Sequence, residues 1–258
     1  IFFFHMGVRG AALATILSQL ISAIWILKFL TGPKAILKLK KNCMKLKRSR
    51  VLRIIGLGMS GFTMSITNSS VQVMYNAMLQ KTGGDLYVGI MTVINTVREV
   101  ISMPVQGITH SSQPVMGYNY GAKEYKRVNN IYRLALTIAI GIMAAGTLLF
   151  MFIPETFMKM FTTQETTIAA GASALRIISC GFIVSSVSVV SSGALEALGK
   201  GNESLVVSLL RYLVIIVPLA FVLSRFIGAN GVWHSFWITE TVTAFVAYGI
   251  YRKALRKK

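Results

Sequence analysis

The sequence predicts an all-α polytopic membrane protein, and three observations support that fold class. Of its 258 residues, 54% are hydrophobic and only 14% are charged. The apolar residues gather in long runs, and a helix needs about 20 mostly apolar residues to cross the hydrocarbon core of a bilayer. The connectors between the runs are short, and Lys and Arg concentrate in alternate ones. A soluble protein of this length needs no such series of runs.

Seven membrane-spanning helices are expected along the chain. Pro104 predicts a kink in the third, Pro154 closes the fourth, and Pro218 lies inside the sixth. The fifth is long enough to tilt in the bilayer or to include an interfacial turn. The expected ranges are 10–30, 54–79, 86–111, 131–153, 166–198, 204–226 and 229–251.

The basic residues predict how these helices are oriented. Residues 34–53 carry nine Lys or Arg and no acid, and further basic groups follow at 122–127, at Lys200 and in the tail 252–258. Lys and Arg in short loops mark the cytoplasmic side of a membrane. We therefore expect a multi-pass protein of the plasma (inner) membrane whose basic connectors and C-terminus face the cytoplasm.

The net charge of +19 does not by itself predict nucleic-acid binding. The basic residues lie at the ends of the expected helices, and the aromatic residues lie mainly inside the apolar spans rather than between the charges. The basic connector either sets the topology or also touches anionic lipid, because a Lys or Arg near such lipid gains about 1 kcal/mol. We expect the lipid bilayer, and no nucleic acid, as a partner.

The residue types that bind metals or perform catalysis are scattered. Cys43 and Cys180 fall on different elements, and so do His5, His110 and His234. This spacing predicts neither a disulfide framework nor a metal site, and we expect no cofactor. Because no acid–histidine or nucleophile–base cluster is visible on one membrane face, an enzyme is disfavoured.

A weak internal repeat predicts two related bundles. Gly7 and Gly10 precede the first expected span as Gly228 and Gly231 precede the last, and both spans end in basic residues. Transporters often consist of two repeated bundles. On this basis we expect the chain to be the later part of a longer protein, beginning with the end of one bundle and continuing with a complete second one. The expected parts are 1–30, the basic connector 31–53, the six-helix unit 54–251 and the tail 252–258.

Three of the expected spans carry stripes of polar residues at helical spacing. Such a stripe either bonds neighbouring helices, at around 0.6 kcal/mol per hydrogen bond, or lines a hydrated cavity. Three stripes in one bundle favour the cavity. Their members are Ser65, Asn68, Gln72 and Asn76; Thr92, Asn95, Glu99, Ser102, Gln106 and Thr109; and Ser185, Ser188, Ser192 and Glu196.

Glu99 stands out because an ionised carboxylate in mid-span costs at least a few kcal/mol unless it is paired or hydrated. It belongs either to a structural ion pair or to a proton or cation site. Arg98 is its neighbour, but adjacent helical residues point about 100° apart. Glu240 is a second mid-span acid, whereas Arg176 and Arg211 are interpreted as structural anchors. The candidates for a substrate or ion pathway are Asn68, Gln72, Asn76, Asn95, Arg98, Glu99, Ser102, Gln106 and Glu240.

The end of the third span carries a specific motif, GITHSSQPVMGYNYGA at 107–122. It closely resembles the loop between helices 8 and 9 of the multidrug and toxic compound extrusion (MATE) family. We expect Pro114 to stop the helix there and Gly117 and Gly121 to permit a tight return. The motif residues to which we assign this structural role are Gln113, Pro114, Gly117, Tyr118, Asn119, Tyr120, Gly121 and Ala122. Further matches lie at 174–176, 197–201 and 209–211.

The resemblance implies a twelve-helix exporter with two six-helix lobes around a central cavity. The chain would supply the end of the N-terminal lobe (1–30), namely the last turn or two of helix 5 at 1–6 followed by helix 6, and the whole C-terminal lobe (54–251). It would work with the missing N-terminal lobe to exchange external H+ or Na+ for small organic, often cationic, compounds.

The sequence also departs from the family pattern. The expected helix 54–79 offers Asn68, Gln72 and Asn76 where Na+-coupled members carry an acid, and 166–198 lacks a mid-span Asp. The coupling ion and the position of its carboxylate therefore stay open. The alternative is a flippase for lipid-linked oligosaccharides of the same superfamily. Such proteins usually line their cavity with cations, and Arg98 is the exception among the amides and hydroxyls here.

Overall fold

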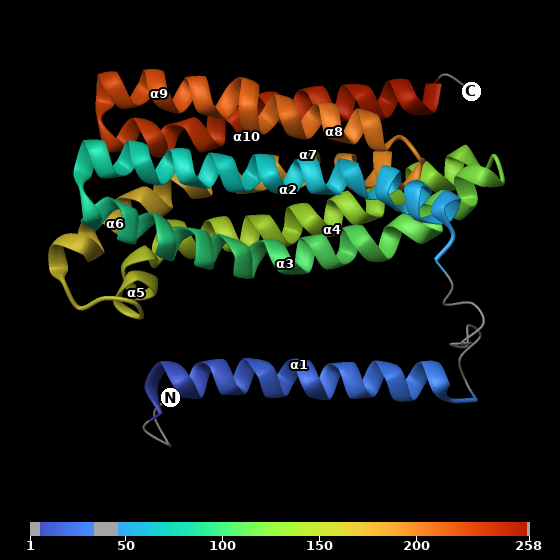
Figure 1. Ribbon diagram of the computed structural model, residues 1–258. Helices are drawn as coiled ribbons and strands as arrows, with labels where there is room; N and C mark the ends of the chain where they lie inside the picture. The colour runs from blue at the N-terminus through green and yellow to red at the C-terminus, as the bar shows by residue number, and fades with distance from the viewer. Residues whose placement is uncertain (1–5, 34–45, 257–258) are drawn as a thin grey trace. The chain divides into compact units, whose positions relative to one another are not determined.

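The computed structural model describes residues 6–33 and 46–256, and every regular element in these ranges is a helix. They divide into two units, Ile1–Gly56 and Leu57–Lys258, each described here by itself. Figure 1 shows the helices. Their bounds are α1 (Gly7–Thr31), α2 (Arg48–Gly83), α3 (Asp85–Gly121), α4 (Tyr125–Phe152), α5 (Pro154–Lys159), α6 (Glu165–Ser179), α7 (Phe182–Ala197), α8 (Gly201–Leu209), the π-helical segment η2 (Leu210–Ile215), α9 (Ile216–Ile227) and α10 (Ala229–Arg256).

The first unit contains α1, which agrees with the expected span 10–30. Its segment Ala12–Thr31 is long and apolar enough to cross a membrane. Large apolar side chains such as Ile21 and Trp25 are exposed along it. The expected end of a preceding helix at 1–5, most of the basic connector with Cys43 at 34–45, and the last two tail residues lie outside the described residues.

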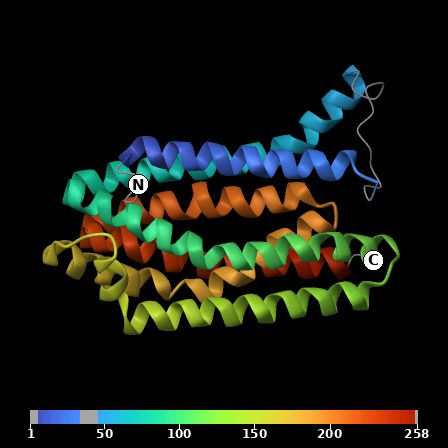
Figure 2. The same cartoon turned by 90° about the horizontal axis from the view of Figure 1, so that it is seen from below.

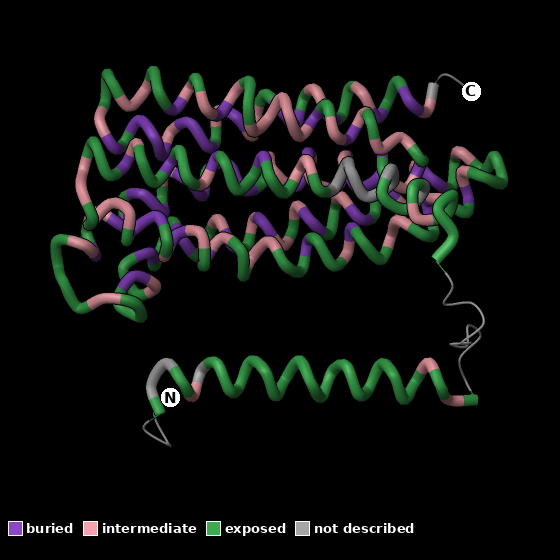
Figure 3. Tube along the Cα trace, in the orientation of Figure 1, coloured by how far each residue is buried: buried purple, intermediate pink, exposed green. Residues whose placement is uncertain are grey.

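The second unit is a bundle of long helices lying side by side (Figure 2). α7 packs against α3, α4 and α10, and α10 also packs against α9. Buried positions recur along the helices between exposed ones (Figure 3), as expected when each helix turns one face to its neighbours. Trp233, Tyr132, Tyr251, Phe150 and Leu79 are among the fully buried core side chains.

Hydropathy distinguishes the long helices of the two units. In the described part of the chain, α1, α3, α4 and the segment Gly201–Ile227 pass a test for membrane spans, and α6 with α7 passes as a bent pair. α2 and α10 are as long as their neighbours but are not among these. Their amide and acidic side chains, including Gln72 and Glu240, lower their hydropathy and, as described below, face a cavity.

The prediction that Pro114 ends its helix is wrong. α3 continues through Pro114 and Gly117 to Gly121, and the turn follows at Lys123, whose φ is 64°. Proline removes one helical hydrogen bond, but neighbouring helices allow it inside a membrane helix.

The packing of α3 on the C-terminal end of α7 explains why the helix persists. Gln113 Nε2 donates to Glu196 Oε2 at 3.2 Å, and Ser204 donates to the other oxygen of Glu196. A Cβ on Gly117 would lie 3.0 Å from the carbonyl oxygen of Ala197. Gly117 thus permits close packing of two helices rather than a chain reversal.

The expected single helix 166–198 is broken. α6 and α7 meet at Cys180–Gly181 with a bend of 51°. A Cβ on Gly181 would lie 2.9 Å from the Cα of Trp237, so only glycine allows α10 to pass this close.

The expected helix 204–226 is also irregular, because η2 interrupts it between α8 and α9. Pro218 lacks an N–H, and its ring displaces the carbonyl of Val214 four residues earlier. Widening of the helix just before a proline accommodates both effects. Single π turns inside helices often occur at functional sites.

Candidate functional site

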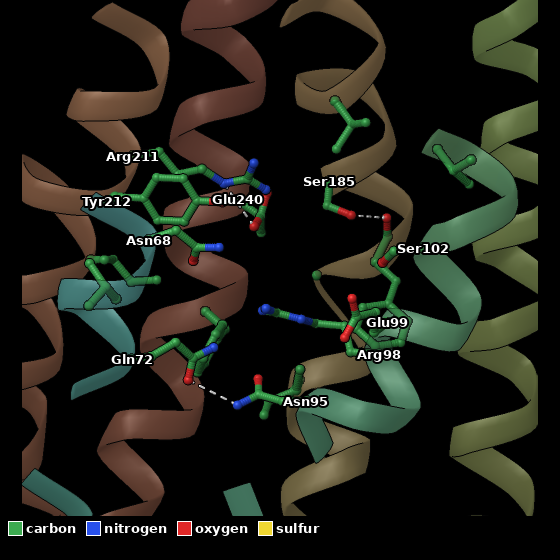
Figure 4. Close-up of a pocket in the computed structure, with 18 of the residues that line it drawn as sticks. Asn68, Gln72, Asn95, Arg98, Glu99, Ser102, Ser185, Arg211, Tyr212 and Glu240 are labelled. Atoms are coloured by element: carbon green, nitrogen blue, oxygen red, sulfur yellow. Dashed lines mark hydrogen bonds and ion pairs between the residues drawn. The ribbon is translucent and has the colours of Figure 1, made fainter. Parts of the chain in front are cut away.

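A cavity of about 290 Å³ lies inside the second unit. Its lining residues come from α2, α3, α6, α7, η2 and α10, together with Met143 of α4 and Ile216 of α9. Both irregular backbone segments border it, through Gly181 at the break and through Arg211 and Tyr212 in η2 (Figure 4). The cavity is therefore built where the helices depart from regular geometry.

Amide side chains form one wall of the cavity, from α2 and α3. Asn95 Nδ2 donates to Gln72 Oε1 at 3.0 Å, and Asn68 lies one helical turn before Gln72. The Oδ1 of Asn95 is buried and has no hydrogen-bond partner among the described residues. A buried acceptor without a partner costs free energy, which a donor on a bound molecule would recover.

A buried ion pair joins η2 to α10. Arg211 Nε donates to Glu240 Oε1 at 3.1 Å, and its Nη2 donates to Oε2. Ser188 of α7 also donates to Oε2, at 3.3 Å. The two side chains are 16% and 12% exposed, and theirs is the one ion pair found in the described residues. A pair with this geometry and an added hydroxyl partner neutralises both charges internally.

Arg98 and Glu99 of α3 are arranged differently. The guanidinium of Arg98 lies over the ring of Phe236, 5.4 Å from its centroid, and Phe236 stacks on Tyr75 at 4.8 Å. No described carboxylate forms an ion pair with Arg98. Figure 4 shows Arg98 reaching across the cavity while Glu99 stays beside α3. Glu99 lines the cavity and is exposed.

The MatE family profile matches residues 60–222, more than half of the chain. The chain belongs to the MATE family. It is similar to the multidrug export protein MepA of Staphylococcus haemolyticus, with 23% identity over 247 residues. The alignment covers 96% of this chain and 54% of that relative, so the MATE chain spans about half the length of the curated relatives it matches.

Solved structures agree in fold. An outward-facing multidrug resistance MATE transporter of the MOP superfamily matches with a TM-score of 0.90 and 22% identity, over 100% of this chain and 58% of the other. A MOP superfamily transporter from Pyrococcus furiosus matches with a TM-score of 0.89 and 23% identity, over 100% and 59%. These matches confirm the family resemblance and the all-α polytopic membrane fold of MATE type.

The MATE chain gathers eight of the nine predicted site residues around this one cavity. Asn76 is the exception: it is exposed and lies one turn along α2 from Gln72, beyond the lining. Ser185 from the third stripe also lines the cavity, whereas Glu196 of that stripe bonds Gln113 at the far end of α7. The eight are Asn68, Gln72, Asn95, Arg98, Glu99, Ser102, Gln106 and Glu240.

The sequence interpretation missed Arg211, Tyr75, Tyr212 and Phe236 as cavity residues. The interpretation of Arg211 as a structural anchor agrees with its ion pair to Glu240, and an arginine and a glutamate on consecutive expected helices are a sequence signal of such a pair. The aromatic residues gave no comparable signal, because aromatic side chains are common throughout apolar spans.

Proposed function

We propose that this chain forms part of a secondary active multidrug efflux antiporter. The observation that carries the proposal is the cavity lined by amides, hydroxyls, charges and aromatic rings inside a MATE-type bundle. In this proposal, small organic, often cationic, compounds leave the cell in exchange for H+ or Na+. The six-helix lobe 54–251 moves against the N-terminal lobe in an alternating-access cycle, as two bundles rock in related transporters.

The proposed orientation places the basic ends of the helices in the cytoplasm. Lys123, Lys126, Lys200 and Lys253 lie at the junctions or ends of α3, α4, α8 and α10. Positive charge in short loops supports an inner-membrane protein with a cytoplasmic C-terminus. An impermeant thiol reagent outside intact cells should therefore fail to label a cysteine placed at Lys253, and labelling would contradict this orientation.

In this proposal, different side chains of the cavity bind the exported compound and the coupling ion. Tyr212 offers a partly exposed ring, and the amides of α2 and α3 offer hydrogen bonds. Glu99 is exposed and without an ion-pair partner in the described chain, so it is available to a proton or a cation. Occupation by one cation disfavours a second, which is the coupling that antiport requires.

One observation favours the alternative of a lipid-linked oligosaccharide flippase, namely that two guanidinium groups line the cavity. Arg98 and Arg211 would both suit a pyrophosphate. However, Glu240 neutralises Arg211, which leaves one available cation. We therefore propose the exporter rather than the flippase.

The test is transport by the full-length protein in inside-out vesicles with an imposed H+ or Na+ gradient. The exporter predicts gradient-driven uptake of a fluorescent organic compound and no translocation of a lipid-linked oligosaccharide. Translocation of the oligosaccharide alone, without need for either gradient, would replace this proposal with the flippase.

A further inference from the structure

The formal charges around the cavity add up to zero, but their electrostatic effects on a bound molecule do not cancel. Four charged side chains line it: Arg98, Glu99, Arg211 and Glu240. Arg211 and Glu240 neutralise one another through two hydrogen bonds. The field that a bound molecule meets therefore depends on Arg98 and Glu99.

Because Arg98 is more buried than Glu99, its charge interacts more strongly with a molecule in the cavity. Arg98 is half-buried, whereas Glu99 is exposed. The interaction of a charge with a ligand grows as the local dielectric constant falls, and an exposed charge is screened by its surroundings. A molecule inside the cavity is thus attracted to Arg98 through its negative groups more strongly than to Glu99 through its positive ones.

Within the described part of the chain, the hydrogen-bond donors of Arg98 are also unused. Its contact with Phe236 is through the ring face, and it makes no hydrogen bond or ion pair with a described residue. A guanidinium carries five N–H donors in a planar fork that matches a carboxylate or sulfonate in two parallel hydrogen bonds. Half-burial without an acceptor leaves these donors available for such a group.

The surface beside Arg98 is aromatic. Phe236 and Tyr75 stack with their planes 15° apart, and the Tyr75 hydroxyl is already hydrogen-bonded to Ser235 at 2.8 Å. The Tyr75 and Phe236 rings are 3% and 6% exposed and are already covered by one another and by Arg98. This packing positions the guanidinium of Arg98, whose N–H donors, rather than the ring faces, are available to a ligand.

We propose that Arg98 is the specificity-determining residue of this cavity and that it selects compounds carrying a carboxylate or sulfonate. The proposal rests on the function proposed above, because it names the substrate class of the same cavity. A compound whose sole charge is positive meets Arg98 as a like charge. A compound with both charges places its negative group at Arg98.

The experiment uses three matched probes that share one fluorescent dialkylamino-coumarin: a carboxylic acid, its methyl ester and a quaternary ammonium derivative. Fluorescence polarisation measures their binding to the purified full-length protein in detergent. We expect the acid to bind about tenfold more tightly than the ester, which is the effect of one charge-assisted hydrogen-bonded contact. Arg98→Gln should remove this preference, and Arg98→Lys should retain part of it.

Arg225→Gln is the matched control. Its guanidinium also lies over a phenyl ring, 4.6 Å from the centroid of Phe221, but it does not line the cavity. This variant should keep the preference for the acid. Gel filtration and thermal melting identify any variant that fails to fold. If both Arg98 variants fail, equal binding of acid and ester by the wild type still overturns the proposal.

The outcomes separate this proposal from the function on which it rests. Equal binding of acid and ester by the wild type, or an unchanged preference in Arg98→Gln, overturns the selection by Arg98. Binding and gradient-driven export of the ammonium derivative alone overturn it too, while multidrug export stands. Binding of none of the three contradicts both.

Discussion

Two arginines line one cavity, yet their surroundings assign them different roles. Arg211 lies in the π turn η2 and is held by Glu240 of the next helix, whereas Arg98 lies on regular helix beside Glu99 and pairs with no described carboxylate. Residues adjacent on a helix point about 100° apart, so proximity in sequence does not create a pair. The comparison shows that the partner on a facing helix, rather than the charge itself, decides whether an intramembrane arginine is structural or available.

Breaking the ion pair between Arg211 and Glu240 should have the largest effect on stability. Glu240→Gln leaves Arg211 charged and largely buried without a counterion, so we expect the protein to lose about 3 kcal/mol of unfolding free energy. A thermal melt of the purified protein measures this, with Glu155→Gln as control because Glu155 is exposed on α5. Equal melting temperatures for Glu240→Gln and the wild type would show that the pair contributes nothing to the fold.

A substitution at Gly181, where the break between α6 and α7 borders the same cavity, should have the second-largest effect on stability. Gly181→Ala places a methyl group 2.9 Å from the Cα of Trp237, so α7 or α10 must shift. Overpacking of this kind costs about 2 kcal/mol. Gly141→Ala is the matched control, since no atom lies within 4 Å of its added Cβ, and it should not destabilise the protein. If both variants melt alike, the close approach at Gly181 is not a constraint.

Replacing both partners of the ion pair should cost less than replacing one. In Arg211→Met/Glu240→Leu no buried charge is left unpaired, so we expect most of the stability lost in Glu240→Gln to return. The same melts test this. A double variant as unstable as Glu240→Gln would mean that Ser188, or another contact of the pair, contributes the stability instead.

The smallest effect on stability is expected at Glu99, which forms no ion pair with a described residue. Glu99→Gln removes an exposed charge, so unfolding free energy should change by no more than about 0.5 kcal/mol. Gradient-driven efflux in vesicles, normalised to folded protein, should nevertheless fall substantially if Glu99 takes part in coupling. Transport equal to that of the parent with both H+ and Na+ gradients would place the coupling carboxylate elsewhere.

The helices were largely predictable from sequence because apolar runs and prolines determine them locally. α1, α4 and α10 fall within a few residues of the expected spans, and Pro154 does mark the end of α4. The persistence of α3 through Pro114 was not predictable, since it depends on packing against Glu196 and Ala197 of α7. Tertiary contacts here outweigh a strong local signal.

The cavity was predictable in its polar wall but not in its charge pairing. Helical spacing alone places Asn68 and Gln72 on one face, and likewise Asn95 and Ser102. The same stripe includes Asn76, which lies beyond the cavity, because periodicity does not say where along a helix a cavity ends. The pairing of Arg211 with Glu240 was indicated only by their presence on consecutive expected helices, because which positions of two helices face each other depends on how the helices pack.

A compound exported by the full-length protein should occupy the cavity that the side chains of α2, α3, α7, η2 and α10 line. This claim is tested most directly by substrate protection of Ser102→Cys, an almost isosteric change in the lining, with Cys43→Ala and Cys180→Ala removing the two thiols of this sequence. Ser111→Cys, exposed on the same helix and outside the lining, is the control. The account predicts that the coumarin acid slows maleimide alkylation at Ser102→Cys and not at Ser111→Cys. Unchanged rates at Ser102→Cys with each of the three coumarins, when at least one is exported, would contradict it.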